Sequence, residues 1–408
     1  MSLSLILQSI TIILAPLYIL RFQIWFPTTL LEVLVLLSLV VNVVNFLKNK
    51  DSLKDLKTPL DFYILLFLIT SLVSLFFSAD FKGGLGIFKA YFIEPVLFYY
   101  GLVYSTRKAS YRYILNSLFL MGFWLGVLGF TQKLTGGFTL APHEAMQGRI
   151  SGVYNSANSL ALIIGPIAVL GMAEFIIWKQ IASKLLALCL FLIMTTVIIW
   201  TKSRGGLIGE VTSLVVILFG FLMIKFRKLL KFWLVLLILL VIISVGLLGF
   251  YLASYDFFPN TYGRIYEGGD TLRIRFYIWA GTVSLLKDHP LFGAGLNGFK
   301  TLYSNFYRLP VFREEFQYPH NIFLTFWAET GIFGLFSFVL LSVTSLGLIV
   351  RNLAKSTQPI LGVGFIGGII YWFIHGFVDV PYFKNDLSLE FWVMLAMIVI
   401  WKRSTVRN

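Results

Sequence analysis

Residues 183–224 read SKLLALCLFLIMTTVIIWTKSRGGLIGEVTSLVVILFGFLMI. Two apolar runs, 183–200 and 205–224, flank the polar segment Thr201–Gly206. A helix needs roughly 20 apolar residues to cross a bilayer core about 30 Å thick. The stretch therefore predicts two membrane-spanning helices joined by a tight turn, and the rest of the chain repeats this pattern.

The composition is typical of a membrane protein. Of the 408 residues 58% are hydrophobic and 17% are aromatic, but only 13% are charged, which is about half the usual share in soluble domains. A water-soluble fold could not bury this much apolar surface, and a disordered chain would be far more polar. The net charge of +14 comes from short clusters between apolar runs, so we expect no nucleic-acid partner. The single cysteine, Cys189, leaves no intramolecular disulfide.

The predicted fold is an all-α bundle that forms one membrane domain over residues 1–408. Continuous apolar runs exclude the alternating pattern of barrel strands, and the first run lacks the marks of a removable signal peptide. The sequence predicts twelve spans, near 3–20, 25–47, 60–78, 85–104, 113–131, 156–177, 183–200, 205–224, 232–254, 320–350, 358–378 and 386–402.

The loop charges predict an orientation. One set of short connections, with the C-terminus, carries more than half of the 33 lysines and arginines, so these loops and both termini are expected in the cytoplasm. The opposite set contains two long loops, 132–155 and 255–319, of which the second joins spans nine and ten.

The outer face keeps many arginines that topology alone would place inside. A guanidinium suits phosphate oxygens better than an ammonium does, so we predict that this face binds an anion. The outer cations include Arg21, Arg149, Lys202, Arg204, Arg264, Arg273, Arg275, Arg308 and Arg313.

Arg204 is the first candidate ligand of that anion. It lies in Thr201–Gly206, at the expected outer start of a membrane helix, where free backbone N–H groups and the helix dipole favour negative charge. The alternative is a turn whose arginine reaches the lipid headgroups.

A second candidate lies in residues 271–279, TLRIRFYIW, which we expect to open an amphipathic helix within the long outer loop. Arg275 and Trp279 are four residues apart and share one helical face, so the indole could orient the guanidinium. Arg273 is a second possible occupant of the same position. The alternative is an interfacial helix with an aromatic belt and a basic rim.

The segment Tyr318–Leu335 supplies the candidate base. Pro319 predicts that His320 and Asn321 lie at the outer start of a membrane helix, where a histidine can accept a proton. Glu329 falls inside the apolar zone, where a carboxylate is costly and usually functional or paired. The alternative is that His320 and Asn321 only cap the helix, while Glu329 pairs with an arginine.

Two further observations limit the chemistry. Gly293–Gly298 spells G-x-G-x-x-G, but no strand precedes it, so we interpret it as a tight turn rather than a dinucleotide site. The sequence contains no H-E-x-x-H motif, no Cys/His cluster and no D-x-D motif. We therefore expect no bound metal and no cofactor.

These motifs, taken in order, resemble the O-antigen ligase and O-antigen polymerase superfamily. The resemblance rests on Arg204-Gly205, on the Arg-x-x-x-Trp helix, on the Gly293–Gly298 turn and on His320-Asn321-x-x-Leu followed by Glu329-x-Gly-x-x-Gly-Leu. The motifs cover about 200–335. The upstream segment Gly148–Asn158 also fits the family's outer segment before a membrane helix.

The resemblance implies a multi-pass glycosyltransferase of the cytoplasmic membrane with its active site facing outward. It would move a glycan from a polyprenyl-diphosphate carrier to a hydroxyl of another glycan, a lipid A-core sugar or a protein, without metal and with inversion. Arg204 and Arg275 would bind the diphosphate, with Arg149, Arg273 and Arg21 as lesser candidates. His320 would orient or deprotonate the acceptor hydroxyl, supported by Trp279, Asn321 and Glu329.

Two other functions remain open from the sequence. A repeat-unit polymerase shares the same motifs as a ligase. A solute transporter is a weaker alternative, because transporters place broken helices and charges near the midplane of two similar halves, whereas here the cations gather at the outer surface.

Overall fold

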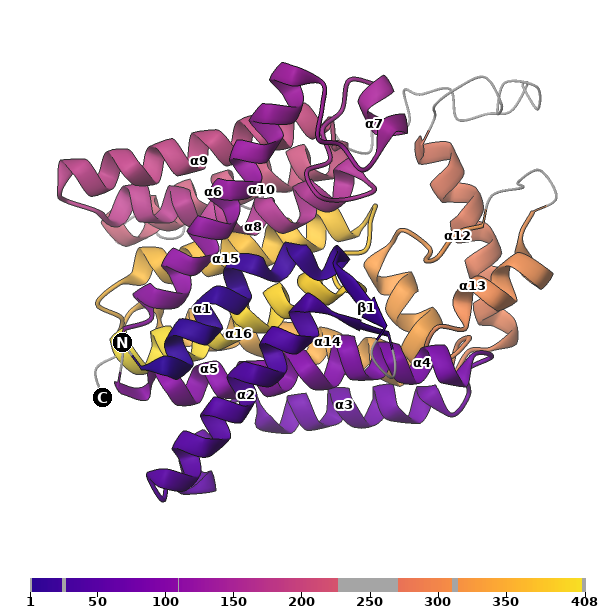
Figure 1. Ribbon diagram of the computed structural model, residues 1–408, viewed down its shortest axis with the longest axis horizontal. Coiled ribbons are helices and arrows are strands. Elements are labelled where there is room, and N and C mark those ends of the chain that lie inside the picture. Colours follow the sequence, from indigo (N-terminus) through magenta and orange to yellow (C-terminus); the bar gives the residue numbers. More distant parts are fainter. Residues whose placement is uncertain (1, 24–26, 109, 227–270, 310–314, 406–408) are drawn as a thin grey trace.

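The computed structural model describes residues 2–23, 27–108, 110–226, 271–309 and 315–405. Within these ranges the chain is mostly helical, which confirms the predicted class (Figure 1). The span predicted at 232–254 lies outside the described residues. The helices are α1 Leu3–Leu14, α2 Leu30–Lys48, α3 Asp61–Leu75, α4 Phe81–Ile87, α5 Glu94–Ser105, α6 Arg112–Thr135, α7 Pro142–Met146, α8 Ala157–Ile177, α9 Ile181–Thr201, α10 Arg204–Lys225, α12 Thr271–Asp288, α13 Phe299–Leu302, α14 Ile322–Leu353, α15 Pro359–Gly376 and α16 Asn385–Thr405.

Seven of the described helices, α2, α6, α8, α9, α10, α14 and α15, are long and apolar enough to cross a membrane. The helices α1 and α3 are apolar but shorter. The chain is therefore a multi-pass membrane protein, and the total of twelve spans stays a prediction.

The centre of the bundle is formed by α8, α15 and α16. Inside the protein, 78% of the α8 span and 67% of the α15 span are buried, against 28% of α9, so α9 turns most of its surface outward. Nearly every residue of α16 is buried. Both termini lie at one end of the bundle, and α7, α12 and α13 lie at the other (Figure 1).

Two predicted spans are interrupted. The span at 3–20 ends as a 3₁₀ turn, η1 (Ala15–Ile19), and leads into the antiparallel pair β1 (Arg21–Gln23) and β2 (Pro27–Thr29). This hairpin corrects the all-α prediction, and it shifts the next helix to Leu30, where Thr29 and Glu32 form a capping box. The span at 85–104 is divided into α4, the π-helical turn η3 (Phe88–Ile93) and α5.

A break in α14 docks the glycine-rich turn. Gly331 has φ 70° and ψ 177°, which interrupts the helix, and the N–H of Ile332 donates to the carbonyl of Leu291 at 3.0 Å. The N–H of Ala294 donates to the carbonyl of Ala328 at 2.7 Å. Gly293 has φ 61°, and the segment forms the tight turn that the sequence predicts.

Gly331→Ala is expected to destabilise the protein by at least about 2 kcal/mol, because this backbone region is open essentially to glycine alone. A Cβ at Gly331 would also lie 2.3 Å from the carbonyl oxygen of Leu291. Gly347→Ala, in the same helix and with nothing within 4 Å of the new Cβ, should be neutral or slightly stabilising. Thermal unfolding of the purified protein measures both changes, and equal midpoints would contradict the requirement for glycine at the break.

Candidate functional site

Asp379, which follows α15, joins four segments of the chain. Its Oδ1 accepts from the N–H of Val380 at 2.9 Å and lies 3.4 Å from Nδ1 of His320. Its Oδ2 accepts from Nδ2 of Asn158 at 2.9 Å and lies 3.7 Å from a terminal nitrogen of Arg275. The carboxylate thus connects the starts of α8 and α14 with α12.

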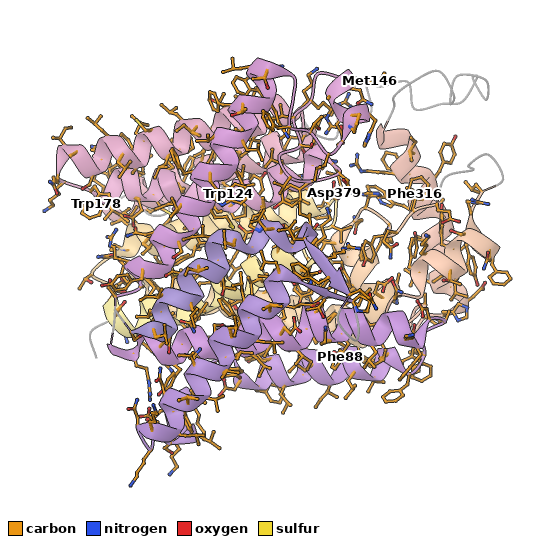
Figure 2. The ribbon with its side chains drawn as sticks, viewed as in Figure 1. Phe88, Trp124, Met146, Trp178, Phe316 and Asp379 are labelled. Atoms are coloured by element: carbon orange, nitrogen blue, oxygen red, sulfur yellow. The ribbon has the colours of Figure 1, made fainter. Side chains whose placement is uncertain are left out.

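Antiparallel packing explains why these residues meet. The helices α14 and α15 follow each other in the chain and pack together, so the first residues of α14 and the last residues of α15 lie at the same end. Figure 2 shows Asp379 and Phe316 on the side of the molecule where Met146 lies, away from Trp178. The site is therefore at the end of the bundle opposite the termini.

His320 is held in an uncommon backbone conformation at the edge of this cluster. Its φ is 53°, a left-handed conformation that Asn, Asp and His adopt more readily than most residues. Its side chain is 38% exposed, so the ring remains accessible from outside. Asn321 is the N-cap of α14: its Oδ1 accepts from the N–H groups of Phe323 and Leu324 at 3.0 Å each, and its Nδ2 donates to the carbonyl of Phe377 at 3.0 Å.

Trp279 supports the turn that precedes His320. Its indole N–H donates to the carbonyl of Pro319 at 2.9 Å. The indole therefore fixes the position of the histidine, whereas the sequence suggested that it would orient Arg275.

Arg275 is a buried cation with an unpaired donor. Its side chain is 13% exposed, and its buried Nε has no hydrogen-bond partner among the described residues. Burial lowers the pKa of Arg275, Asp379 raises it, and the charges of Arg149 and Arg204 lower it again. Three guanidinium groups are therefore close enough to repel one another, and one carboxylate, Asp379, faces Arg275.

Arg149 is already engaged by protein groups. Its Nε donates to the carbonyl of Thr201 at 2.7 Å, and its terminal nitrogens donate to Oε2 of Glu144 at 2.7 Å and to Oδ1 of Asn158 at 2.8 Å. Arg149 therefore connects α7 and the start of α8 with the end of α9. Because these donors already bond to protein groups, its main contribution to the site is positive charge.

Arg204 begins α10, as the sequence predicts, and is exposed. Ser203 caps this helix by accepting from the N–H of Gly206 at 3.3 Å, and it contacts Nε2 of His375 at 3.1 Å. A Cβ at Gly205 would lie 2.7 Å from the ring of His375, so glycine is needed for α10 to approach α15 this closely.

The other two arginine candidates are less well placed or not described. The side chain of Arg273 lies outside the described atoms. Arg21 is exposed on β1, and the structure brings it near Tyr18 and Tyr91 rather than into the Asp379 cluster.

Glu329 holds the glycine-rich turn instead of pairing with an arginine. Its Oε2 accepts from the backbone N–H of Asn297 at 2.5 Å, and its Oε1 accepts from the N–H of Phe299 at 3.4 Å. The side chain is fully buried, so these two bonds satisfy a carboxylate that would otherwise be costly at this depth.

Sequence reasoning gave Asp379 too small a part. From the sequence alone, Asp379 and the nearby His375 are interpreted as a structural pair inside the bundle. The distance of Asp379 in the sequence from His320, Asn158 and Arg275 hides their contact. The available signal was its position at the end of an apolar run on the same side as His320.

Asp379→Asn should destabilise the protein on the order of 3 kcal/mol, because Arg275 would be left as a buried, uncompensated charge. Burial opposes the charge of Asp379, but the hydrogen bond and charge of His320, with Arg275, hold the pKa of Asp379 well below its usual range. A depressed pKa contributes stability that is fully present above the unfolded value of about 3.9 and is lost as pH falls below it.

The stability difference between wild type and Asp379→Asn should therefore be present at neutral pH and be lost as pH falls below about 4. Thermal unfolding across this range measures it. Asp288→Asn, whose exposed carboxylate accepts from Tyr307, is the control and should change little. A difference that already disappears near pH 6 would show that another group sets the charge of the cluster.

The protein is thus a multi-pass helical membrane protein in which arginines, a histidine and an aspartate lie together at one end of the bundle. Residues 189–339 match the family described as O-antigen ligase. This match supports membership of the O-antigen ligase family and confirms the resemblance found in the sequence.

The matched segment contains Arg204, Arg275 and His320 but ends before Asp379. A protein of Haemophilus influenzae, described as uncharacterized, is 22% identical over 354 residues, which cover 80% of this chain and 82% of that protein. The match over residues 189–339 supports a membrane protein of O-antigen ligase or polymerase type.

Proposed function

We propose that the protein is a glycosyltransferase that moves a glycan from a polyprenyl-diphosphate carrier to an acceptor hydroxyl at the Asp379 end of the bundle. The proposal rests on Arg275, a buried guanidinium on which Arg149 and Arg204 act electrostatically. Within the part of the chain that the structure describes, its Nε lacks a hydrogen-bond partner. Such a surplus of positive charge favours an anion that carries more than one charge.

The diphosphate is the leaving group, and its oxygens gain charge as the glycosidic bond breaks. Donors that are already in place stabilise such charge without reorganisation. Arg275 and Arg204 bind these oxygens, and Arg149 strengthens the field from its position between Glu144 and Asn158. In this proposal Arg273 and Arg21 contact the outer part of the donor.

His320 is the base in this proposal. Its Nδ1 faces the Asp379 carboxylate, so the proton stays on Nδ1 and Nε2 is left to accept the acceptor's proton. The acceptor oxygen forms a bond to the anomeric carbon, the bond from that carbon to the phosphate oxygen breaks, and its electron pair leaves with the polyprenyl diphosphate. Attack from the side opposite the leaving group inverts the anomeric carbon.

The proposed setting is the cytoplasmic membrane, with both termini in the cytoplasm and the site outside. This orientation is supported by the loop charges and by the placement of the termini (Figure 1) and of Asp379 (Figure 2) at opposite ends of the bundle. The acceptor is a glycan, a lipid A-core sugar or a protein hydroxyl. A repeat-unit polymerase differs from a ligase only in that acceptor, whereas a solute transporter would need charges near the midplane of two similar halves.

The test uses purified full-length protein in liposomes with a labelled glycan on polyprenyl diphosphate and EDTA present. Label transferred to a lipid A-core or a protein identifies a ligase, and label in lengthened glycans identifies a polymerase. Transfer to none of the acceptors, together with solute uptake into the same liposomes, would replace the proposal with a transporter.

A further inference from the structure

A second polar site lies at the end of the bundle that carries the termini, away from Asp379. It is a groove of about 530 Å³ between α6, α8 and α9. Its polar part is formed by Arg112, Asn116, Glu174 and Ser183, and its apolar part includes Phe119, Leu120, Phe123, Leu186 and Leu190. Figure 2 shows Trp178, which also lines the groove, at this end.

The groove has the shape of a site for an amphipathic molecule. Arg112 is the first residue of α6, Glu174 lies near the end of α8, and Ser183 lies in the first turn of α9, so the polar groups share one end. The apolar residues continue along α6 as far as Phe123, about 16 Å from Arg112 at 1.5 Å per residue. That length suits an acyl chain lying against helices that face the lipid.

The polar end carries one charge of each sign. A terminal nitrogen of Arg112 donates to Oε2 of Glu174 at 2.5 Å, and the guanidinium lies 4.6 Å from the Trp178 ring. Because a guanidinium has five donors, Arg112 keeps capacity for a second acceptor. Its side chain is 25% exposed, so a ligand can reach it.

Two further features indicate which groups a ligand of this groove must supply. The other oxygen of Glu174, Oε1, is buried and has no hydrogen-bond partner among the residues that the structure describes, so it can accept a hydrogen bond from a ligand. The N-cap of α9, Gln180, makes no side-chain capping bond, so the first N–H groups of this helix favour an anion beside Ser183.

We propose that this groove binds a phospholipid with a primary-amine headgroup, such as phosphatidylethanolamine. The phosphate contacts Arg112 and the start of α9, the ammonium donates to Glu174, and one acyl chain lies along α6. A neutral pair of opposite charges in the protein matches a zwitterion in the lipid. A choline headgroup carries the same charges but has no N–H to donate, and a glycerol headgroup adds net negative charge that Glu174 opposes.

The test is native mass spectrometry of delipidated full-length protein in detergent, offered equal amounts of phosphatidylethanolamine, phosphatidylcholine and phosphatidylglycerol with identical acyl chains. Wild type should retain the ethanolamine lipid at least about tenfold over the choline lipid, as expected for one hydrogen bond to a charged group. Equal retention of these two lipids by wild type would overturn the proposal.

Two variants and one control make the assignment specific. Glu174→Gln should bring the ethanolamine-to-choline ratio near one and raise retention of phosphatidylglycerol, because Arg112 loses its anion. Glu210→Gln removes another buried membrane carboxylate, one bonded to Thr195, and should keep the preference.

Asn116→Trp fills the groove from an exposed position and leaves the ion pair intact, so it should abolish retention of the ethanolamine lipid. It serves as the second variant if Glu174→Gln does not fold. An unchanged preference in a folded Glu174→Gln or Asn116→Trp protein would overturn the proposal.

Discussion

His320→Ala is expected to lower the rate of glycan transfer at least about 100-fold, the usual contribution of a positioned general base. Donor binding should change little, because the arginines that face the diphosphate remain. The measurement is turnover by purified protein at saturating donor, together with donor affinity. The fold should survive, since the ring is 38% exposed and lies at the edge of the cluster.

His320→Asn separates the loss of the base from the loss of structure. Asparagine tolerates the left-handed backbone at this position and can still donate a hydrogen bond to Asp379, but it cannot accept a proton. It should therefore match wild type in thermal stability and match the alanine variant in activity. His143→Ala, at an exposed position in α7, is the control and should keep full activity. Near-normal turnover in His320→Asn would show that His320 is not the general base.

Arg275→Ala is expected to lower turnover by about 100- to 1,000-fold, the range found when one donor to a developing anion is removed. The reason is that the guanidinium is buried and its Nε makes no hydrogen bond to any described residue, so it can contact the leaving diphosphate where water is largely excluded. The measurement is turnover at saturating donor.

Arg275→Lys and Arg21→Ala distinguish a specific contact from general positive charge. Lysine keeps the charge but lacks the planar fork of donors. The turnover of Arg275→Lys should therefore lie between that of Arg275→Ala and that of wild type. Arg21 is exposed on β1, outside the Asp379 cluster, and its removal should cost only a few-fold. If Arg21→Ala lowers turnover as much as Arg275→Ala does, the diphosphate binds nearer to the β1–β2 hairpin than proposed.

The sequence predicted well those features that depend on local chemistry. Pro319, His320 and Asn321 mark the start of α14, and the structure begins this helix at Ile322 with Asn321 as its cap. The junction at Thr201–Gly206 likewise ends α9 and begins α10 at Arg204.

Features that depend on packing between distant segments could not be predicted in this way. The partners of Glu329 are backbone N–H groups of a turn 30 residues earlier, and a carboxylate in an apolar run does not reveal them. Asp379 lies at the centre of the site because α14 and α15 pack side by side, which a linear sequence does not show.

One local signal was overlooked. Thr29 followed by Glu32 is a capping pattern, and it places the start of α2 after Pro27 rather than inside a continuous span. The hairpin that precedes α2 places Arg21 away from the Asp379 cluster. The Thr29–Glu32 capping pattern would therefore also have made Arg21 a weaker candidate for diphosphate binding.

Attack by an acceptor hydroxyl with release of polyprenyl diphosphate is tested most directly by measuring both products of one reaction, run by purified wild-type protein in EDTA. One polyprenyl diphosphate should be released for each glycosidic bond formed, and the anomeric carbon should be inverted. Release of a carrier monophosphate, glycan transfer without carrier release, or retention at the anomeric carbon would contradict attack by an acceptor hydroxyl activated at His320 against a diphosphate held by Arg275.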